Sequence, residues 1–201
     1  MPKRTIPDGN FVFHVMNRSA RRLRLFEGDN DYQEFLACVL LGLEQVAVRL
    51  LAYCIMPNHF HLIVWPHKSP ELSDFMRIVT GAHGRRWQRR RRVEGTGCVY
   101  QGRFRAVVVR RDSDFLAVCR YVERNALRAG LVTRAEEWPW SSLYQRCRNC
   151  HAVPLHPWPI PQPTDWLRMV NDVQSESDVN AVRSSIGYRP RGRPRKGKVA
   201  G

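Results

Sequence analysis

Two histidines separated by one residue, His59 and His61, are side chains that could hold a metal ion together. They begin an apolar run that predicts a β-strand, in which residues two apart project from the same face, about 6.5–7 Å apart along the strand. Imidazole nitrogens at that spacing can bind one ion. Seven histidines in a chain of 201 residues make such a pair a common chance event, so the pair alone does not establish a metal site.

A tyrosine and an asparagine four residues apart, Tyr121 and Asn125, lie in a segment whose pattern predicts a helix over 112–129. Residues at this spacing share one face of a helix. Asn125 could give a metal ion a carbonyl oxygen as third ligand, and Tyr121 would then stand beside a phosphate drawn in by that ion. A metal stabilises the charge that builds on such a phosphate and positions it for in-line attack. The plainer interpretation makes Tyr121 a core residue and Asn125 a polar surface residue.

The chain carries 33 Lys and Arg against 18 Asp and Glu, a net charge of +15, and most of the excess is arginine. The planar guanidinium suits phosphate, so we expect a polyanionic partner. We predict that arginines near the end of a helix follow the phosphate backbone of a single strand, and that a basic tail is either a further DNA contact or a solvated end. The predicted DNA-binding residues are Arg18, Arg85, Arg86, Arg89, Arg90, Arg103, Arg105, Arg191, Arg193 and Arg195.

Apolar periodicity predicts the elements that position these side chains. Short β-rich runs predict four strands, and apolar residues at three- and four-residue spacing predict three helices. The order β-α-β-β-α-β-α predicts an α+β fold, with a ferredoxin-like antiparallel sheet and helices packed on one face. The predicted strands are 11–16, 48–56, 60–65 and 104–110, and the predicted helices are 31–46, 72–92 and 112–129.

A change of composition after residue 145 predicts a boundary. Prolines recur between 154 and 163, and the last residues are too basic and too poor in apolar side chains to fold alone. We therefore expect one domain over 1–145 and a Pro-rich linker with a basic DNA-binding tail over 146–201. The sequence has no apolar run near the roughly 20 residues that span a bilayer and no apolar stretch typical of a signal peptide, so we expect a cytoplasmic protein without membrane partners.

One cysteine cluster allows a second metal site. Cys147, Cys150 and His151 match the attachment pattern of c-type haem, but that modification requires export, for which the sequence gives no signal. Cys147, Cys150, His151 and His156 could bind zinc, because thiolate and imidazole both suit that ion. An unligated surface turn is the alternative.

Five segments, in this order along the chain, carry the most specific pattern: 13–18 (FHVMNR), 52–64 (AYCIMPNHFHLIV), 101–105 (QGRFR), 120–130 (RYVERNALRAG) and 140–142 (WSS). Together they resemble the signatures of the HUH single-tyrosine transposases, and within them the REP-associated tyrosine transposases. The resemblance covers about residues 10–145.

This resemblance implies that His59 and His61 bind a divalent ion, Mg²⁺ or Mn²⁺, that Tyr121 makes a 5′-phosphotyrosine link with DNA, and that Asn125 assists at the metal. The family usually has Asn-Pro where this chain has Asn125-Ala126. That difference should loosen a local helix distortion without removing a catalytic atom. The tail 191–196 is similar both to the basic end of these transposases and to an AT-hook, which inserts into narrow minor grooves.

The sequence therefore predicts an enzyme that cleaves and rejoins single-stranded DNA with hairpin structure through a 5′-phosphotyrosine intermediate. One alternative is a non-catalytic DNA-binding regulator derived from such a transposase. Another is a metal-dependent phosphodiesterase that uses water in place of Tyr121. The sequence leaves both a monomer and a homodimer open.

Overall fold

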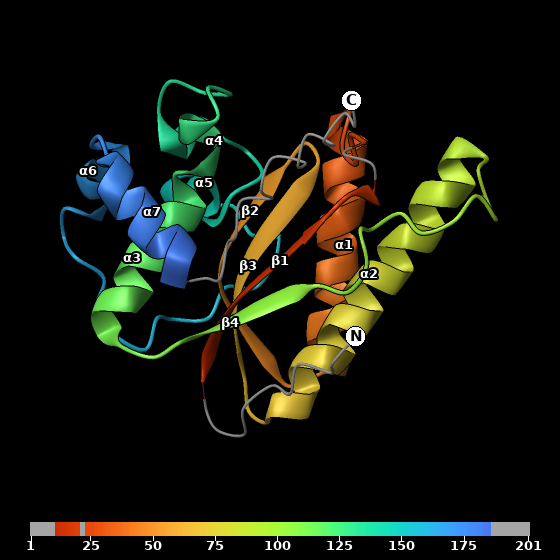
Figure 1. The fold of residues 1–201 in the computed structure, drawn as a ribbon, viewed down its shortest axis with the longest axis horizontal. Coiled ribbons are helices and arrows are strands. Elements are labelled where there is room, and N and C mark those ends of the chain that lie inside the picture. The colour runs from red at the N-terminus through yellow and green to blue at the C-terminus, as the bar shows by residue number, and fades with distance from the viewer. Residues whose placement is uncertain (1–10, 21–22, 186–201) are drawn as a thin grey trace, which may run out of the picture.

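The computed structural model describes residues 11–20 and 23–185 (Figure 1). The predicted tail contacts Arg191, Arg193 and Arg195 lie outside the described residues. Within the described ranges, no helix has both the length and the apolar composition to cross a membrane. The strands are β1 (Val12–Arg18), β2 (Val48–Met56), β3 (His59–Pro66) and β4 (Arg105–Val109). The helices are α1 (Asp29–Gln45), α2 (Ser69–Arg91), α3 (Asp112–Glu123), α4 (Asn125–Arg128), the 3₁₀-helix η2 (Ala135–Glu137), α5 (Ser142–Cys147), α6 (Trp166–Asn171) and α7 (Glu176–Ser185).

The four strands form one antiparallel sheet in the order β2-β3-β1-β4. β1 and β3 are central, and β2 joins β3 through a tight turn at Pro57 and Asn58, residue types that favour turns. This strand order, with α1 between β1 and β2 and α2 between β3 and β4, confirms the predicted ferredoxin-like α+β fold.

One face of the sheet is covered by α1 and α2, which lie side by side (Figure 1). Alternate residues of the central strands, such as Val15, Phe60 and Leu62, are buried in the core on this side. Gly42 allows the two helices to approach closely, because a Cβ at that position would lie 2.8 Å from ring carbons of Phe75. This face is therefore a tightly packed structural layer.

The other face of the sheet is covered as well, by α3 with α5, α6 and α7 (Figure 1). The sequence analysis predicted helices on one face only, and the second layer corrects that expectation. The physical reason lies in β2, which is buried without interruption from Leu50 to Met56. Successive residues of a strand point to opposite faces of the sheet, so a strand that is apolar at every position must be covered on both faces.

The segment after residue 145 is part of the folded unit as far as residue 185. The ring of Trp158 packs edge-on against Phe115 of α3 and Trp166 of α6, at centroid distances of 5.3 and 5.0 Å. Arg124 Nη1 donates to the carbonyl oxygen of Val170 at the end of α6, at 2.6 Å. The tryptophans among the prolines thus dock this segment, which the sequence predicted as a linker.

The helix predicted over 112–129 is interrupted next to Asn125. α3 ends at Glu123 and α4 begins at Asn125, with Arg124 between them. The backbone N–H of the fully buried Ala126 donates to the thiol of Cys54 in β2. The distortion that the Asn125-Ala126 pair was expected to loosen is therefore present without a proline.

Candidate active site

The sheet face beneath α3 brings three histidines together. His59 and His61 project from β3 to the same face, as their spacing predicted, and their ring centroids lie 5.0 Å apart. His14 joins them from the neighbouring strand β1, with its ring centroid 5.1 Å from that of His61. The sequence analysis did not select His14, although its place in the 13–18 segment was a signal.

Hydrogen bonds fix how the imidazoles point. His59 Nδ1 lies 2.7 Å from Asn58 Oδ1, and His61 Nδ1 lies 2.9 Å from His14 Nε2. Because Asn58 Oδ1 is an acceptor, His59 Nδ1 carries the proton and His59 Nε2 keeps its lone pair. His61 Nε2 keeps a lone pair in the same way when His61 Nδ1 donates to His14. The bonds at Nδ1 thus leave Nε2 of both rings as the metal-binding atom.

Burial keeps these imidazoles neutral. Desolvation lowers the pKa of His14 to about 3 and that of His59 to about 4, with the positive charges of Arg18 and Arg128 adding to the shift at His59. Desolvation also lowers the pKa of His61 well below its ordinary value. Neutral imidazole is the form that binds metal, so the site is ready for an ion at neutral pH.

Acidification is expected to destabilise the protein before its carboxylates titrate. Burial holds the pKa of His14 and that of His83 at about 3 in the fold, against the ordinary 6.5. Between these values the unfolded chain takes up protons that the folded chain excludes. The free energy of unfolding should therefore fall with falling pH, by about 1.4 kcal/mol per pH unit for each imidazole.

Urea unfolding at pH 7 and pH 5 measures this loss of stability, and His83→Phe should remove the contribution of one imidazole. The same pH dependence in that variant would contradict the assignment.

The helices α3 and α4 place both predicted catalytic side chains over the same face. The Tyr121 ring lies perpendicular to the ring of His61, with centroids 5.8 Å apart. Asn125 follows one turn later and is buried. The structure thus brings Tyr121 against the histidine pair of β3, which lies about 60 residues earlier in the chain. Tyr121 itself is only 4% exposed, so a substrate reaches it only if a covering group moves.

Arg128 is the side chain that contacts both Tyr121 and Asn125. Its Nη2 donates to Asn125 Oδ1 at 2.7 Å, and its Cζ lies 4.2 Å from the centre of the Tyr121 ring, a cation–π contact. Arg128 was not among the predicted site residues. Its spacing of three from Asn125 and seven from Tyr121 is nevertheless that of one helix face.

The side chains present fit a divalent ion. His59 and His61 offer neutral nitrogens, and Asn125 Oδ1, which accepts from Arg128, retains a second lone pair. Within the part of the chain that the structure describes, no group of three or more His, Cys, Asp or Glu side chains could hold an ion. The side chains that could hold an ion on this face are the two imidazoles of His59 and His61 and the amide of Asn125, a set that would leave coordination positions for water or substrate oxygen.

The strand register places two predicted DNA-binding arginines on this face. Arg18 lies directly across from His59, and Arg105 lies across from Met16, whose other neighbour is His61. Directly opposed residues of antiparallel strands project to the same side of a sheet. Arg18 and Arg105 therefore belong to the face that carries the histidines.

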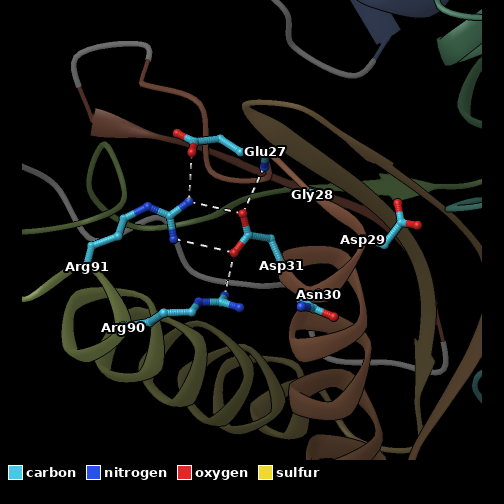
Figure 2. A pocket seen from close by; sticks show the side chains of 7 residues that line it. All are labelled: Glu27, Gly28, Asp29, Asn30, Asp31, Arg90 and Arg91. Atoms are coloured by element: carbon cyan, nitrogen blue, oxygen red, sulfur yellow. Dashed lines mark hydrogen bonds and ion pairs between the residues drawn. The ribbon is translucent and has the colours of Figure 1, made fainter.

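Some arginines at the basic end of α2 form ion pairs with carboxylates of α1, and others do not. Arg90 and Arg91 both form ion pairs with Asp31 of α1, at 2.5 and 3.0 Å (Figure 2). Arg90 also pairs with Glu34 of α1, at 2.5 Å. Arg90, predicted as a DNA contact, is thus held in the α1–α2 interface. Within the described part of the chain, the other members of the predicted set in this region, Arg85, Arg86, Arg89 and Arg103, are exposed and form no ion pair with α1, although Arg89 lies 4.0 Å from Glu94.

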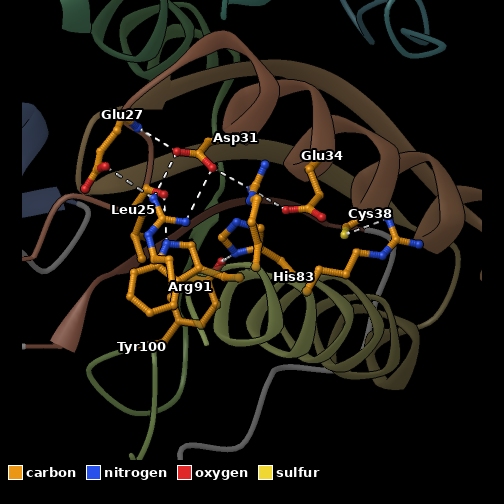
Figure 3. Close-up of polar contacts among 11 residues, drawn as sticks. Leu25, Glu27, Asp31, Glu34, Cys38, His83, Arg91 and Tyr100 are labelled. Atoms are coloured by element: carbon orange, nitrogen blue, oxygen red, sulfur yellow. Dashed lines mark hydrogen bonds and ion pairs between the residues drawn. The ribbon is translucent and has the colours of Figure 1, made fainter. Parts of the chain in front are cut away.

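The hollow beside these ion pairs is separate from the candidate site. It lies between the start of α1 and the end of α2, on the sheet face opposite Tyr121. Figure 3 shows that Asp31, at the edge of this hollow, also accepts a hydrogen bond from the backbone N–H of Glu27. The buried hydrogen bond of 2.6 Å between His83 and Tyr100 lies nearby. The network joins two helices and a loop, which is a structural role.

The cysteine cluster after α5 does not form a metal centre in the described residues. Cys147 is exposed and Cys150 is partly buried. His156 Nδ1 lies 2.9 Å from the carbonyl oxygen of Pro157, and its ring faces Trp65. The four side chains considered for zinc, Cys147, Cys150, His151 and His156, are thus not gathered around one point in the described structure.

Comparison with known proteins shows which family and which solved structures this chain is similar to. A sequence model of the family described as "Transposase IS200 like" matches residues 9–125, which run from before β1 to Asn125. The chain is also similar to the structure of a REP-associated tyrosine transposase bound to a REP hairpin, with 17% identity, 81% of this chain and 97% of that chain covered, and a TM-score of 0.56. This likeness shows a shared fold.

A candidate transposase from Deinococcus radiodurans R1 matches more distantly, with 15% identity, 76% of this chain and 98% of that chain covered, and a TM-score of 0.43. No curated protein matches this sequence.

Proposed function

Because the chain belongs to the IS200-like transposase family, we propose that it cleaves and rejoins single-stranded DNA through a covalent bond between Tyr121 and a 5′-phosphate. The observation that supports this proposal is the position of Tyr121 against the imidazoles of β3, with Asn125 connected to the Tyr121 ring through Arg128. A nucleophile, neutral metal-binding nitrogens and an amide are the groups that such a reaction needs.

In the proposed reaction the phenol oxygen of Tyr121 attacks phosphorus. A bond forms between that oxygen and phosphorus, and the bond from phosphorus to the 3′-oxygen breaks. The phenol loses a proton and the 3′-oxygen gains one, so the step is balanced. The phosphotyrosine conserves the phosphodiester energy, and a 3′-hydroxyl can reverse the reaction to rejoin a strand without ATP.

His59 and His61 would hold a divalent ion, Mg²⁺ or Mn²⁺, with Asn125 Oδ1 as the third protein ligand. When bound, such an ion offsets the charge that builds on the phosphate and aligns it for displacement. The protein prepares this site by bonding Nδ1 of both rings, to Asn58 and to His14. Imidazole and amide ligands are compatible with either ion.

The proposed substrate is single-stranded DNA with hairpin structure. The REP-associated transposase of similar fold is bound to a REP hairpin. In this chain Arg18 and Arg105 lie on the face of the candidate site, and further exposed arginines lie on α2 and before β4. The residues proposed to carry out cleavage all lie within the predicted domain over 1–145, and the tail residues Arg191, Arg193 and Arg195 would add DNA contacts.

Binding is expected to depend steeply on salt, through the exposed arginines and not through Arg90. Five phosphate contacts would give a log–log slope near −3.5, from roughly 0.7 per phosphate on a single strand. Arg103→Gln should reduce that slope by about 0.7. Arg90→Gln should leave the slope unchanged and lower the melting temperature, because Arg90 pairs with Asp31 and Glu34. Fluorescence anisotropy at several salt concentrations measures the slopes. Equal slopes for the two variants would contradict this division of the arginines.

A DNA-binding regulator without cleavage is the rival that one observation favours, the burial of Tyr121. A covalent adduct between the protein and a hairpin oligonucleotide separates the alternatives. The proposed transposase forms the adduct, whereas a regulator or a water-dependent phosphodiesterase does not. Tyr121→Phe should abolish the adduct and change DNA affinity by no more than a few-fold, since only a hydroxyl is removed.

A further inference from the structure

Two hydrogen-bond donors beside Tyr121 are buried and have no acceptor among the described residues. They are Asn125 Nδ2 and Arg128 Nη1. Buried polar atoms are nearly always paired, because an unpaired one loses its hydration without compensation. These two donors belong to side chains already joined by the bond from Arg128 Nη2 to Asn125 Oδ1. They therefore form one donor group, next to the proposed nucleophile, that lacks an acceptor.

The chemistry of these donors specifies an anionic oxygen. An N–H group cannot bind a cation, so a metal ion does not satisfy either donor. A guanidinium forms charge-assisted bonds with phosphate oxygens, for which its fork has the right geometry. Arg128 also lies on the ring of Tyr121, which in turn lies against His61. A phosphate between this guanidinium and a divalent ion at His61 would offset the repulsion between the two positive charges.

We propose that Arg128 Nη1 and Asn125 Nδ2 bind a non-bridging oxygen of the phosphate that Tyr121 attacks. The inference rests on the proposed function and names the substrate-binding group of that same site. In the free protein the guanidinium covers the Tyr121 ring and fixes the Asn125 amide. With DNA bound, its charge stabilises the phosphate as negative charge builds during attack.

A purely structural role for Arg128 is the rival interpretation, and Arg124 provides the control. Arg124 lies one turn earlier, and its Nη1 donates to the carbonyl oxygens of Val170 and Asn171, at 2.6 and 2.7 Å. Replacing Arg124 should therefore weaken the docking of α6 without changing how the site recognises a phosphate.

The test uses the full-length protein and hairpin oligonucleotides drawn from the sequences that flank its gene. Each oligonucleotide carries one methylphosphonate, which replaces a charged phosphate oxygen by a methyl group. Binding is measured in EDTA, so that no cleavage occurs, for the wild type, Arg128→Gln, Arg128→Lys and Arg124→Gln. Thermal melting verifies that each variant is folded. A separate incubation of the wild type with Mn²⁺ maps the linkage that is cleaved.

We expect one methylphosphonate to weaken binding by the wild type and by Arg124→Gln about tenfold, the worth of a charge-assisted hydrogen bond. The same substitution should weaken binding by Arg128→Gln less than about twofold, because the contact is already lost. Arg128→Lys should give an intermediate result, and the sensitive linkage should be the cleaved one.

Equal methylphosphonate profiles for the wild type and Arg128→Gln would overturn the inference, because Arg128 would then have no phosphate contact. A sensitive linkage that is never joined to Tyr121 would overturn the assignment of that phosphate as the one attacked. If the wild type forms no adduct with any hairpin, the proposed function fails, and it fails independently of the binding profiles.

Discussion

Replacing Glu123 with alanine is expected to lower the free energy of unfolding by about 3–5 kcal/mol. The carboxylate is fully buried and accepts hydrogen bonds from Ser142 Oγ at 2.6 Å, Arg146 Nη1 at 2.5 Å and Trp166 Nε1 at 2.8 Å. Alanine would leave the largely buried charge of Arg146 without its carboxylate partner. Urea unfolding at neutral pH measures the loss.

Two further variants make this prediction specific. Glu123→Gln should cost less, because an amide oxygen can still accept from Ser142 or Arg146. Asp114→Ala breaks a mostly exposed pair with Arg111 and should change stability by less than about 1 kcal/mol. A similar loss for Glu123→Ala and Asp114→Ala would contradict the account. Because Glu123 ties α3 to α5 and α6, its loss should also reduce cleavage by Tyr121.

Replacing His59 with alanine is expected to reduce Mn²⁺ affinity by more than about 100-fold. Loss of a residue that only hydrogen-bonds to a metal ligand reduces metal affinity by up to about 100-fold, and loss of the ligand itself should cost more. Stability should change little, because His59 is partly exposed and its side chain forms a hydrogen bond with the adjacent Asn58. His61→Ala is a less clean test, since His61 is buried and bonded to His14. Isothermal titration with Mn²⁺ measures both variants.

His67 supplies the matched control for the metal measurement. It follows the same strand, is exposed, and lies 3.2 Å from Arg49 through its Nε2. His67→Ala should bind Mn²⁺ as the wild type does. Wild-type affinity in His59→Ala, or an equal loss in His67→Ala, would show that the imidazoles of β3 are not the ligands.

The sequence predicts those parts of the site that depend only on the residue spacing within one strand or one helix. A two-residue spacing on a strand placed His59 and His61 on one face, and a four-residue spacing on a helix placed Tyr121 and Asn125 together. Despite the helix break at Arg124, both side chains of the latter pair contact Arg128. The ferredoxin-like sheet followed from the order of apolar runs, for the same local reason.

The parts that could not be predicted depend on contacts between distant residues. Nothing in the spacing of Arg90 shows that two carboxylates of α1 neutralise it. Nothing near Trp158 shows that the Pro-rich segment folds back onto Phe115. Arg128 was missed because its helical spacing indicates a shared face with Tyr121 but does not show that the guanidinium covers the tyrosine ring. These are properties of tertiary packing, which a periodic pattern does not encode.

The central claim is that Tyr121 becomes covalently bound to DNA. The direct measurement is mass spectrometry of the protein after incubation with a single-stranded hairpin and Mn²⁺, followed by proteolysis. The account predicts a peptide containing Tyr121 that is linked to the 5′-phosphate of the cleaved strand, and no such peptide from Tyr121→Phe. An adduct of undiminished yield in Tyr121→Phe, or a wild-type protein that binds hairpins tightly without ever forming an adduct, would contradict it.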